Sequence, residues 1–248
     1  QMGLVLARLL AEKNAPCVLS GPFPDEVERL ARERRSPRLP DFTLPDSIRV
    51  EPIAARALHG AALVVNAIPT QFIRAVWVPL ASSLPREAVV MSVAKGFERG
   101  SHRLPCDILA ESLRTPTNAT PPMVALTGPT IAAELARRLP AAMLAASHHA
   151  EAAHLVQRVF TTPWLRIYTH DDPMGAEVAG ALKNVIALAA GMIDGLGLGF
   201  NAKSALLARG LAEMVRLGVA LGAKTETFFG IAGVGDLATT CFSPEGRN

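Results

Sequence analysis

Short apolar runs separated by helical segments constrain this chain more than any other feature. The runs at 63–68, 88–93 and 123–126 are rich in Val, Leu, Met and Ala, and each is bounded by Pro, Gly or polar residues. Such runs are typical of buried strands, and the segments between them carry helical patterns. Strands that alternate with helices form right-handed βαβ crossovers, so the pattern predicts a doubly wound parallel sheet.

The pattern extends beyond these runs in both directions. Toward the start we expect a helix over about 3–13 and a short strand at 17–19, and further on two strands at 141–146 and 165–168 bracket a helix at about 151–159. After about Asp171 the sequence changes to long helical patterns rich in Ala, Leu and Gly, without a convincing strand up to Gly222. We therefore predict an α/β domain over 1–170 and an all-α domain over 171–248.

Composition excludes several classes of protein. Half of the 248 residues are apolar, which is enough for a sizeable core. The formal net charge of +3 comes without a long Lys/Arg run, so we expect small anionic ligands and no nucleic-acid partner. Cys17, Cys106 and Cys241 are far apart and form no CxxC, which predicts neither a disulfide framework nor a zinc site. A reducing compartment fits this cysteine usage.

No membrane segment or signal peptide is expected. The longest apolar stretch, 185–200, is interrupted by Asp194 and by four glycines. The first ten residues have no charged leader followed by an apolar core, and no small-residue cleavage site. The glycine run at 195–199 follows a helix instead of a strand, so we predict a loop there and no nucleotide-binding turn.

The segment 176–190 is apolar around nearly its whole circumference, which predicts a buried helix. Its middle nevertheless contains Lys183 and Asn184, and no carboxylate stands one helical turn from Lys183. We expect an ammonium without a counter-ion, whose pKa is lowered by loss of hydration and whose neutral amine can act as a general base. The alternative is that Lys183 reaches solvent from a partly exposed helix.

Three further positions could carry chemistry. Lys95 follows the strand at 88–93, at the strand end where ligands bind in doubly wound sheets, and could hold an anion or polarise a carbonyl, or be a solvated loop lysine. Thr130, after Thr127-Gly128-Pro129, could cap a helix whose free N–H groups suit an anion, although a turn with a cap explains it equally. Asp236 stands at a glycine turn with a hydroxyl one helical turn later, or simply caps its helix.

Taken together, the sequence resembles the NAD(P)-dependent glycerol-3-phosphate dehydrogenase family, particularly its bacterial branch, over essentially the whole chain. The motifs that carry the resemblance are SVAKG at 92–96, GPT at 128–130, GALKNVIA at 180–187, RGLAEM at 209–214 and GVGDL at 233–237. The resemblance implies a Rossmann-type dinucleotide-binding domain followed by an all-α substrate domain. It also implies that a strand and two glycines precede Gln1, with Gly3 as the third glycine of the turn, and that further helices follow Asn248.

The resemblance implies reversible hydride transfer between NAD(P)H and dihydroxyacetone phosphate, giving sn-glycerol 3-phosphate for glycerophospholipid synthesis. Lys183 resembles the proton acceptor, with Lys95 and Asp236 orienting the oxygen and the amine. The implied cofactor-binding positions are Gln1, Met2, Gly3, Lys95, Thr130, Ala132 and Arg247. The implied substrate-binding positions are Lys95, Gly128, Thr130, Lys183, Asp236, Gly246, Arg247 and Asn248. The family often has Ser where this chain has Gly246, so one hydrogen bond to the substrate is absent or comes from backbone.

Cofactor choice is left open by the residues themselves. Ser20-Gly21-Pro22 stands where a strand should end, with neither an Asp or Glu for a ribose 2′-hydroxyl nor an Arg for a 2′-phosphate. Without a carboxylate to repel the phosphate, we expect NADP(H) to be accepted at least as well as NAD(H). We further expect a cytoplasmic homodimer with a small phosphorylated substrate and no membrane insertion. The alternatives are a related two-domain dehydrogenase acting on another hydroxy acid or sugar acid, and a non-catalytic nucleotide-binding module.

Overall fold

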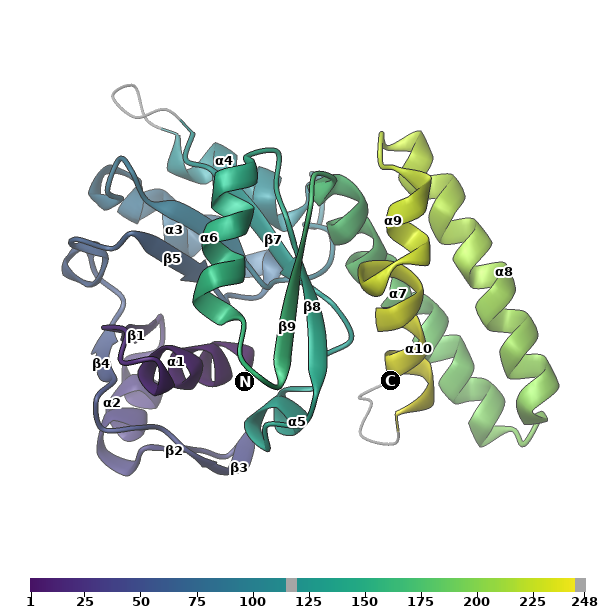
Figure 1. Cartoon of the computed structure of the whole chain (residues 1–248), viewed down its shortest axis with the longest axis horizontal. Helices are drawn as coiled ribbons and strands as arrows, with labels where there is room; N and C mark the ends of the chain where they lie inside the picture. The colour runs from purple at the N-terminus through teal and green to yellow at the C-terminus, as the bar shows by residue number, and fades with distance from the viewer. Residues whose placement is uncertain (115–119, 244–248) are drawn as a thin grey trace.

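The computed structural model describes residues 1–114 and 120–243, which form an α/β part and a helical part (Figure 1). The main sheet has five strands in the order β5-β6-β7-β8-β9. These are β5 (Leu63–Asn66), β6 (Val89–Ser92), β7 (Met123–Thr127), β8 (Ala141–Ala146) and β9 (Leu165–His170). All five strands that the apolar runs predict in this region are present, and parallel pairs dominate, which confirms the doubly wound, Rossmann-type class.

One pair in the main sheet is not parallel. β7 and β8 run antiparallel, with Ala125 opposite Ala146 and Thr127 opposite Leu144. The connection between them carries only the five-residue helix α5 (Ala132–Ala136). This connection returns the chain to the sheet at the end where β7 leaves it, so no full crossover is made. The expectation of a purely parallel sheet is therefore wrong at this position.

The first strand of the chain belongs to a separate small sheet. β1 (Val18–Gly21) pairs in parallel with β4 (Arg49–Pro52), and within the described residues neither strand is hydrogen-bonded to the main sheet. α2 (Pro24–Glu33) connects β1 to a hairpin of β2 (Arg35–Ser36) and β3 (Leu39–Thr43). The sequence did not predict this hairpin, because two residues in β2 are too few to show an alternating pattern.

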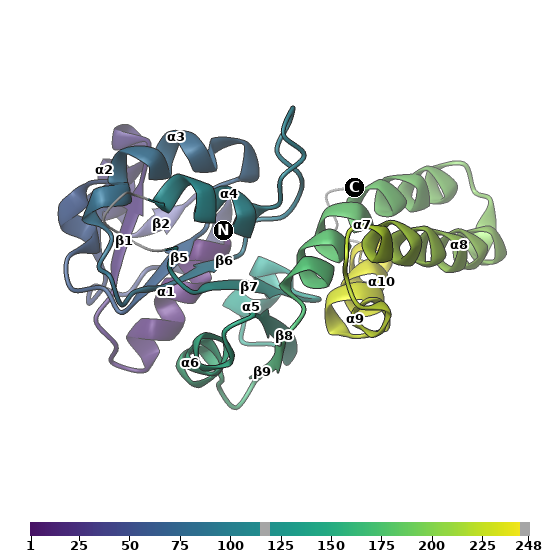
Figure 2. The same cartoon turned by 90° about the horizontal axis from the view of Figure 1, so that it is seen from above.

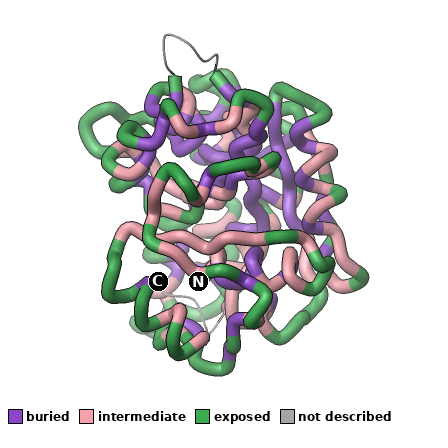
Figure 3. The backbone as a smooth tube through the Cα atoms, turned by 90° about the vertical axis from the view of Figure 1, so that its left-hand side faces the viewer, coloured by how far each residue is buried: buried purple, intermediate pink, exposed green. Residues whose placement is uncertain are grey.

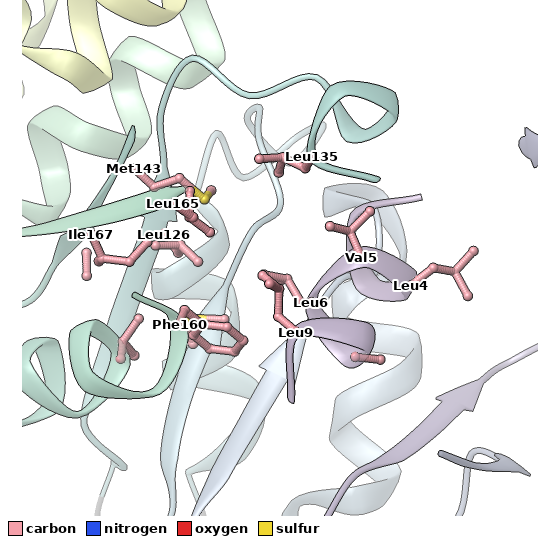
Figure 4. Packing of buried hydrophobic residues seen from close by; sticks show 14 of the residues in the cluster. Leu4, Val5, Leu6, Leu9, Leu126, Leu135, Met143, Phe160, Leu165 and Ile167 are labelled. Atoms are coloured by element: carbon pink, nitrogen blue, oxygen red, sulfur yellow. The ribbon is translucent and has the colours of Figure 1, made fainter. Parts of the chain in front are cut away.

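Helix α1 (Met2–Glu12) fills the space beside the main sheet. Its side chains Leu6 and Leu9 are buried in a cluster with Leu126, Leu165 and Phe160 (Figure 4). Phe160 ends α6 (Ala150–Phe160), which packs against β9. Burying each of these large apolar side chains stabilises the fold by about 1.5–3 kcal/mol. The predicted helices at 3–13 and 151–159 are confirmed within one residue at each end.

The other face of the main sheet is covered by short helices. They are η1 (Ala55–Leu58), η2 (Thr70–Phe72), α3 (Ile73–Trp77), η3 (Val78–Ser83) and α4 (Pro105–Leu113). Ile73, Trp77 and Ile108 from these helices pack with Val90 of β6 in a second core cluster. Figure 3 shows buried segments inside the α/β part and exposed segments at its outer loops.

The helical part contains the remaining elements of the chain. They are α7 (Pro173–Gly195), α8 (Gly199–Ala220), α9 (Thr225–Phe229), the π-helical turn η4 (Ile231–Gly235) and α10 (Asp236–Phe242). α7 leaves the sheet and packs along α8 (Figure 2). A Cβ on Gly210 of α8 would lie 2.7 Å from the Ile186 side chain, so this glycine lets the two helices approach. The loop expected at 195–199 is present as a short turn between α7 and α8.

Only one side of α7 is buried. Val185, Leu188 and Met192 form a stripe that is more than half exposed, so the expectation of a helix buried all around is wrong on this side. α7 has 23 residues, and its most apolar 18-residue stretch has a mean hydropathy of 1.4. It therefore has the length and composition of a membrane-crossing helix, which the sequence analysis did not expect. The core helix of a folded protein can have the same composition. Glu177 and Lys183 of α7 have partners inside the molecule.

Candidate active site

Two lysines and one carboxylate from distant parts of the chain meet between the sheet and the helical part. Lys95 lies three residues after β6, Lys183 lies in the middle of α7, and Asp236 begins α10. Lys95 Nζ donates a hydrogen bond to Asp236 Oδ2 at 2.5 Å, and Lys183 Nζ donates to Asp236 Oδ1. One carboxylate therefore bridges two ammonium groups.

Burial sets the electrostatics of this cluster. The Asp236 side chain is 2% exposed and the Lys183 side chain is 10% exposed, whereas the Lys95 side chain is 26% exposed. Burial lowers the pKa of the Lys183 ammonium to about 8; the nearby Lys95 charge adds to the shift, and Asp236 opposes it. About a tenth of Lys183 is thus neutral at pH 7, and both protonation states are accessible, as a group that exchanges protons requires.

The predicted absence of a counter-ion for Lys183 is wrong. It holds for the helix that carries this lysine, but the fold brings in Asp236 from 53 residues away. The same contact shows that the alternative interpretation, in which Asp236 simply caps its helix, is wrong. Gly235, which has no side chain to cap with, occupies the N-cap position of α10. The Asp236 carboxylate instead accepts hydrogen bonds from the lysines.

Thr240 completes the surroundings of Lys183. Lys183 Nζ donates to Thr240 Oγ1 at 2.8 Å, and Thr240 Oγ1 donates to the backbone oxygen of Asp236 at 2.7 Å. The four-residue spacing from Asp236 to Thr240 was the only signal in the sequence, because it places both on one face of α10. The contact with Lys183 depends on the packing of α10 against α7.

Three residues to which the sequence analysis gave no role in the site hold Lys95 in place. Thr70 Oγ1 donates to the backbone oxygen of Lys95 at 2.9 Å. Gly96, the next residue, has a φ of +107°, which L side chains rarely adopt. A Cβ on Gly180 of α7 would lie 3.4 Å from Lys95 Cδ and 3.5 Å from Thr127 Oγ1. The Lys95 side chain therefore lies across α7 at a position where the helix has no side chain.

The turn after β7 lies beside the same cluster, although Thr130 does not cap a helix. Gly128 has a φ of +147°, and a Cβ there would lie 2.9 Å from the backbone oxygen of Ala142. Thr130 Oγ1 donates to the Gly128 oxygen at 3.3 Å, and α5 begins at Ala132 with Ile131 as its N-cap and no side-chain cap. The expected cap is therefore wrong, and the hydroxyl serves the turn.

A cavity of about 400 Å³ opens beside the start of α1. Gln1 and Gly3 line it, together with Ala67, which directly follows β5. Met2 instead packs against the hydrophobic core. Pockets of this size hold small molecules or part of a larger one. Ala67, Lys95 and Gly128 follow the parallel strands β5, β6 and β7, so the cavity and the lysines lie along one edge of the sheet.

The far wall of this cavity is charged, contrary to the expectation for this region. Ser20, Gly21 and Pro22, at the end of β1, line this wall and contain no ionisable side chain. The same wall also contains Glu26, Arg29, Arg35 and Arg38. These residues come from α2 and the hairpin, which sequence reasoning could not place at the end of β1.

A buried acid that the sequence analysis did not single out links the two parts of the molecule. Glu177 of α7 accepts a hydrogen bond from the backbone N–H of Cys106, near the start of α4, at 3.0 Å. Burial raises the pKa of the Glu177 carboxyl to about 8. The residues Gly246, Arg247 and Asn248, to which the resemblance gives substrate and cofactor roles, lie outside the described residues.

Comparison with known proteins matches the chain to one family. Residues 1–153 match the family model for the NAD-dependent glycerol-3-phosphate dehydrogenase N-terminus, and residues 172–248 match the model for its C-terminus. A glycerol-3-phosphate dehydrogenase (NAD(P)+) of Frankia casuarinae is 43% identical over 251 residues, covering 99% of this chain and 73% of that protein. The enzyme of that name from Corynebacterium glutamicum is 46% identical over 85% of this chain, and the match spans 62% of the relative.

A solved structure supports the same fold. The crystal structure of glycerol-3-phosphate dehydrogenase from Coxiella burnetii superposes with a TM-score of 0.91 at 32% sequence identity. The match covers 99% of this chain and 74% of that one. This chain therefore corresponds to about three quarters of that solved chain, and to less than two thirds of the Corynebacterium relative.

Proposed function

Since this chain belongs to the NAD-dependent glycerol-3-phosphate dehydrogenase family, we propose that the protein interconverts dihydroxyacetone phosphate and sn-glycerol 3-phosphate with NAD(P)H as cofactor. The observation that carries the proposal is the buried Lys183–Asp236–Lys95 cluster at the carboxyl edge of the sheet. Ketone reduction needs a proton donor for the developing alkoxide, and a buried lysine with a lowered pKa meets this need.

Lys183 is the proton carrier in this proposal. When bound, the nicotinamide supplies the hydride that C2 of the ketone accepts. The Lys183 ammonium gives a proton to the C2 oxygen, and the neutral Lys183 amine takes it back when glycerol 3-phosphate is oxidised. Thr240 Oγ1 and Asp236 Oδ1, both in contact with Lys183 Nζ, orient the amine.

Asp236 and Lys95 have different tasks. Asp236 keeps the two ammonium groups together, because without its charge they would repel each other. Lys95 is more exposed than Lys183, so its ammonium is placed to polarise the substrate oxygen or hold an anionic group of the substrate. The reaction is balanced: the hydride and one proton add across the C2 carbonyl, and both leave again in oxidation.

The residues present fit a dinucleotide. Among the described residues, the buried hydroxyl of Ser20 has no hydrogen-bond partner, and Ser20 lines the cavity beside α1. On the cofactor side we retain Gln1, Met2, Gly3, Lys95, Thr130, Ala132 and Arg247 as proposed contacts. On the substrate side we retain Lys95, Gly128, Thr130, Lys183, Asp236, Gly246, Arg247 and Asn248.

The organisation of the whole protein is part of the proposal. A dinucleotide-binding domain over 1–170 and a substrate domain over 171–248 are supported by the end of β9 at His170 and the start of α7 at Pro173. A cytoplasmic location is supported by three free cysteines. We include a homodimer in the proposal because two-fold symmetric dimers are the commonest assemblies of such proteins. The product would feed glycerophospholipid synthesis.

A substrate panel tests the proposal. Oxidation of NADPH should be followed by the loss of the absorbance of the reduced nicotinamide. The substrates to compare are dihydroxyacetone phosphate, dihydroxyacetone and a keto acid. We expect turnover of the phosphorylated ketone only. Preferred turnover of the keto acid would favour the related hydroxy-acid dehydrogenase, and nucleotide binding without turnover of any compound would favour the non-catalytic module.

A further inference from the structure

The loop between β6 and α4 carries Lys95 and has an unusual backbone. Within the described residues 93–104 the chain forms neither helix nor strand. Three of these residues have a positive φ: Gly96 at +107°, Gly100 at +82° and His102 at +56°. A positive φ is uncommon for a residue with a side chain, such as His102. The loop therefore needs contacts with its surroundings to hold this shape, and the position of Lys95 depends on them.

Gln71 of η2 holds the loop with both ends of its side-chain amide. Its Nε2 donates to the backbone oxygen of Phe97 at 2.7 Å, and its Oε1 accepts from the backbone N–H of Arg99 at 3.0 Å. One amide thus takes the place that a neighbouring strand would have beside the loop. Gln71 is exposed, and an exposed glutamine that is fixed at both ends gives up side-chain freedom. This geometry indicates that Gln71 serves to shape the loop.

Arg74 of α3 holds the same loop by charge. Its Nε donates to both carboxylate oxygens of Glu98, at 2.8 and 2.9 Å, and its Nη2 donates to Glu111 of α4 at 2.5 Å. The Glu98 side chain is only 13% exposed, so this pair is better shielded from water than most surface ion pairs. Together with Thr70, which binds the Lys95 oxygen, the segment η2–α3 therefore binds the loop at Lys95 and just after it.

The loop is also in contact with the helical part. The Phe97 side chain packs against the core cluster that contains Val178 of α7, and Leu104 at the end of the loop is buried in that cluster. The backbone of the loop is therefore bound by η2 and α3, while its apolar side chains pack on the helices that carry Lys183 and Asp236. In this position the loop brings Lys95 to those two residues.

We propose that Gln71 and Arg74 are positioning residues of the reaction, which fix the loop at 93–104 and thereby hold the Lys95 ammonium against Asp236. This inference rests on the proposed function, because it concerns the lysine to which that function gives a substrate contact. Both residues act through the loop. Once the loop is released, the long Lys95 side chain has no fixed origin and samples positions away from Asp236. Displacing a reacting group by about 1 Å can lower a rate by about a hundredfold.

The pKa of Lys183 reports where Lys95 lies. Burial and the Lys95 charge lower this pKa to about 8, and Asp236 raises it. If Lys95 moves away, its repulsion is lost and Asp236 serves one ammonium instead of two, so the pKa of Lys183 should rise above about 8. The chain has five lysines, so NMR of protein with isotope-labelled lysine Cε atoms can follow Lys183 through a pH titration. The Lys183 signal is identified by its absence from Lys183→Met.

Variants that conserve charge test the proposal. Gln71→Met keeps the size of the side chain and removes both bonds to the loop backbone. Arg74→Lys keeps the charge and loses the paired hydrogen bonds to Glu98. In Gln71→Met/Arg74→Lys we expect the pKa of Lys183 to rise above about 8, and kcat/KM for dihydroxyacetone phosphate to fall by about tenfold or more. Each single variant should change both quantities less, in the same direction.

The matched control is Gln157→Met/Arg138→Lys. Gln157 Nε2 donates to the backbone oxygen of Ile167 at 2.8 Å, and Arg138 donates twice to Glu12 Oε1, at 2.8 and 3.2 Å. The control therefore loses the same kinds of bond, on the side of the main sheet where α1 and α6 pack. It should keep the Lys183 pKa and the kcat/KM of the wild type.

An unchanged pKa of Lys183 in the folded double variant would overturn the proposal, and so would an equal rise in the control. Should the double variant fail to fold, Gln71→Met decides by the same criterion. The titration needs no substrate, so its result does not depend on the dehydrogenase reaction. A wild-type protein that does not turn over dihydroxyacetone phosphate, together with a raised Lys183 pKa in the variants, would contradict the proposed function and leave the role of Gln71 and Arg74 in holding Lys95 intact.

Discussion

Lys183 and Asp236 form a buried ion pair across 53 residues of chain, joining the middle of α7 to the first residue of α10. The same carboxylate also binds Lys95, which comes from the end of β6. The ion pair therefore joins the helical part to the edge of the sheet where the cofactor is proposed to bind. Its properties lead to testable consequences for catalysis and stability.

Asp236→Asn should weaken both the fold and the reaction. Removing one partner of a buried ion pair typically costs about 3–5 kcal/mol of unfolding free energy, and here it leaves two neighbouring ammonium groups without their shared counter-ion. The pKa of Lys183 should fall below about 8, because Asp236 raises it in the wild type. Urea unfolding and a pH profile measure the two effects. Asp171→Asn, at an exposed partner of Lys224, is the matched control.

The rate should depend on pH with opposite signs in the two directions. Oxidation of glycerol 3-phosphate needs the neutral Lys183 amine, so kcat/KM should rise with pH up to about 8 and then level off. Reduction of dihydroxyacetone phosphate needs the ammonium, so kcat/KM should fall above about pH 8. Initial rates in both directions between about pH 6 and 9 give the measurement. Identical profiles in both directions would contradict a proton carried by Lys183.

Gly180 should tolerate alanine and reject valine. An added Cβ makes only ordinary contacts, 3.4 Å from Lys95 Cδ and 3.5 Å from Thr127 Oγ1, so Gly180→Ala should keep kcat within about twofold. The extra methyl groups in Gly180→Val enter the space that Lys95 occupies, and kcat should fall by about tenfold to a hundredfold. Circular dichroism should show both variants folded. A valine variant with full kcat would mean that the placement of Lys95 across Gly180 is unimportant.

Glu177→Gln should change how stability depends on pH. The folded-state pKa of Glu177 is raised to about 8 by burial, so the folded protein keeps the proton that the unfolded chain loses near pH 4.5. Wild-type stability should therefore decline from about pH 4.5 to about 8, as far as this group contributes. Cys106 and Asp107 are the neighbouring ionisable groups, and the Asp107 charge adds to the raised pKa. In Glu177→Gln, unfolding midpoints measured across this range should decline less steeply than in the wild type.

Much of the fold could be predicted from local patterns. The runs at 63–68, 88–93 and 123–126 are strands because buried parallel strands need continuous apolar sequence, and the change after Asp171 marks the start of the helical part. The direction of β8 could not be predicted in this way. An apolar run looks the same in a parallel and an antiparallel strand, and only the path of 128–140 decides between them.

The site was predictable where one residue conflicts with its surroundings. Lys183 stands out because a lysine in the middle of an apolar helix is unusual, and this signal is local. Its counter-ion is not local: Asp236 reaches it only after α10 packs on α7. The charged wall of the cavity could not be predicted for the same reason, since Arg35 and Arg38 reach the end of β1 only through a hairpin that has no clear pattern of its own.

The kcat of Lys183→Met tests the central claim most directly, because methionine keeps the length of the side chain and removes the exchangeable proton. Lys224→Met, which changes an exposed lysine paired with Asp171, serves as the control. With saturating dihydroxyacetone phosphate and NADPH, we predict that kcat of Lys183→Met falls by at least roughly two orders of magnitude, while the control stays near wild type. A Lys183→Met enzyme with kcat near that of the wild type would contradict the role of Lys183 as the proton carrier.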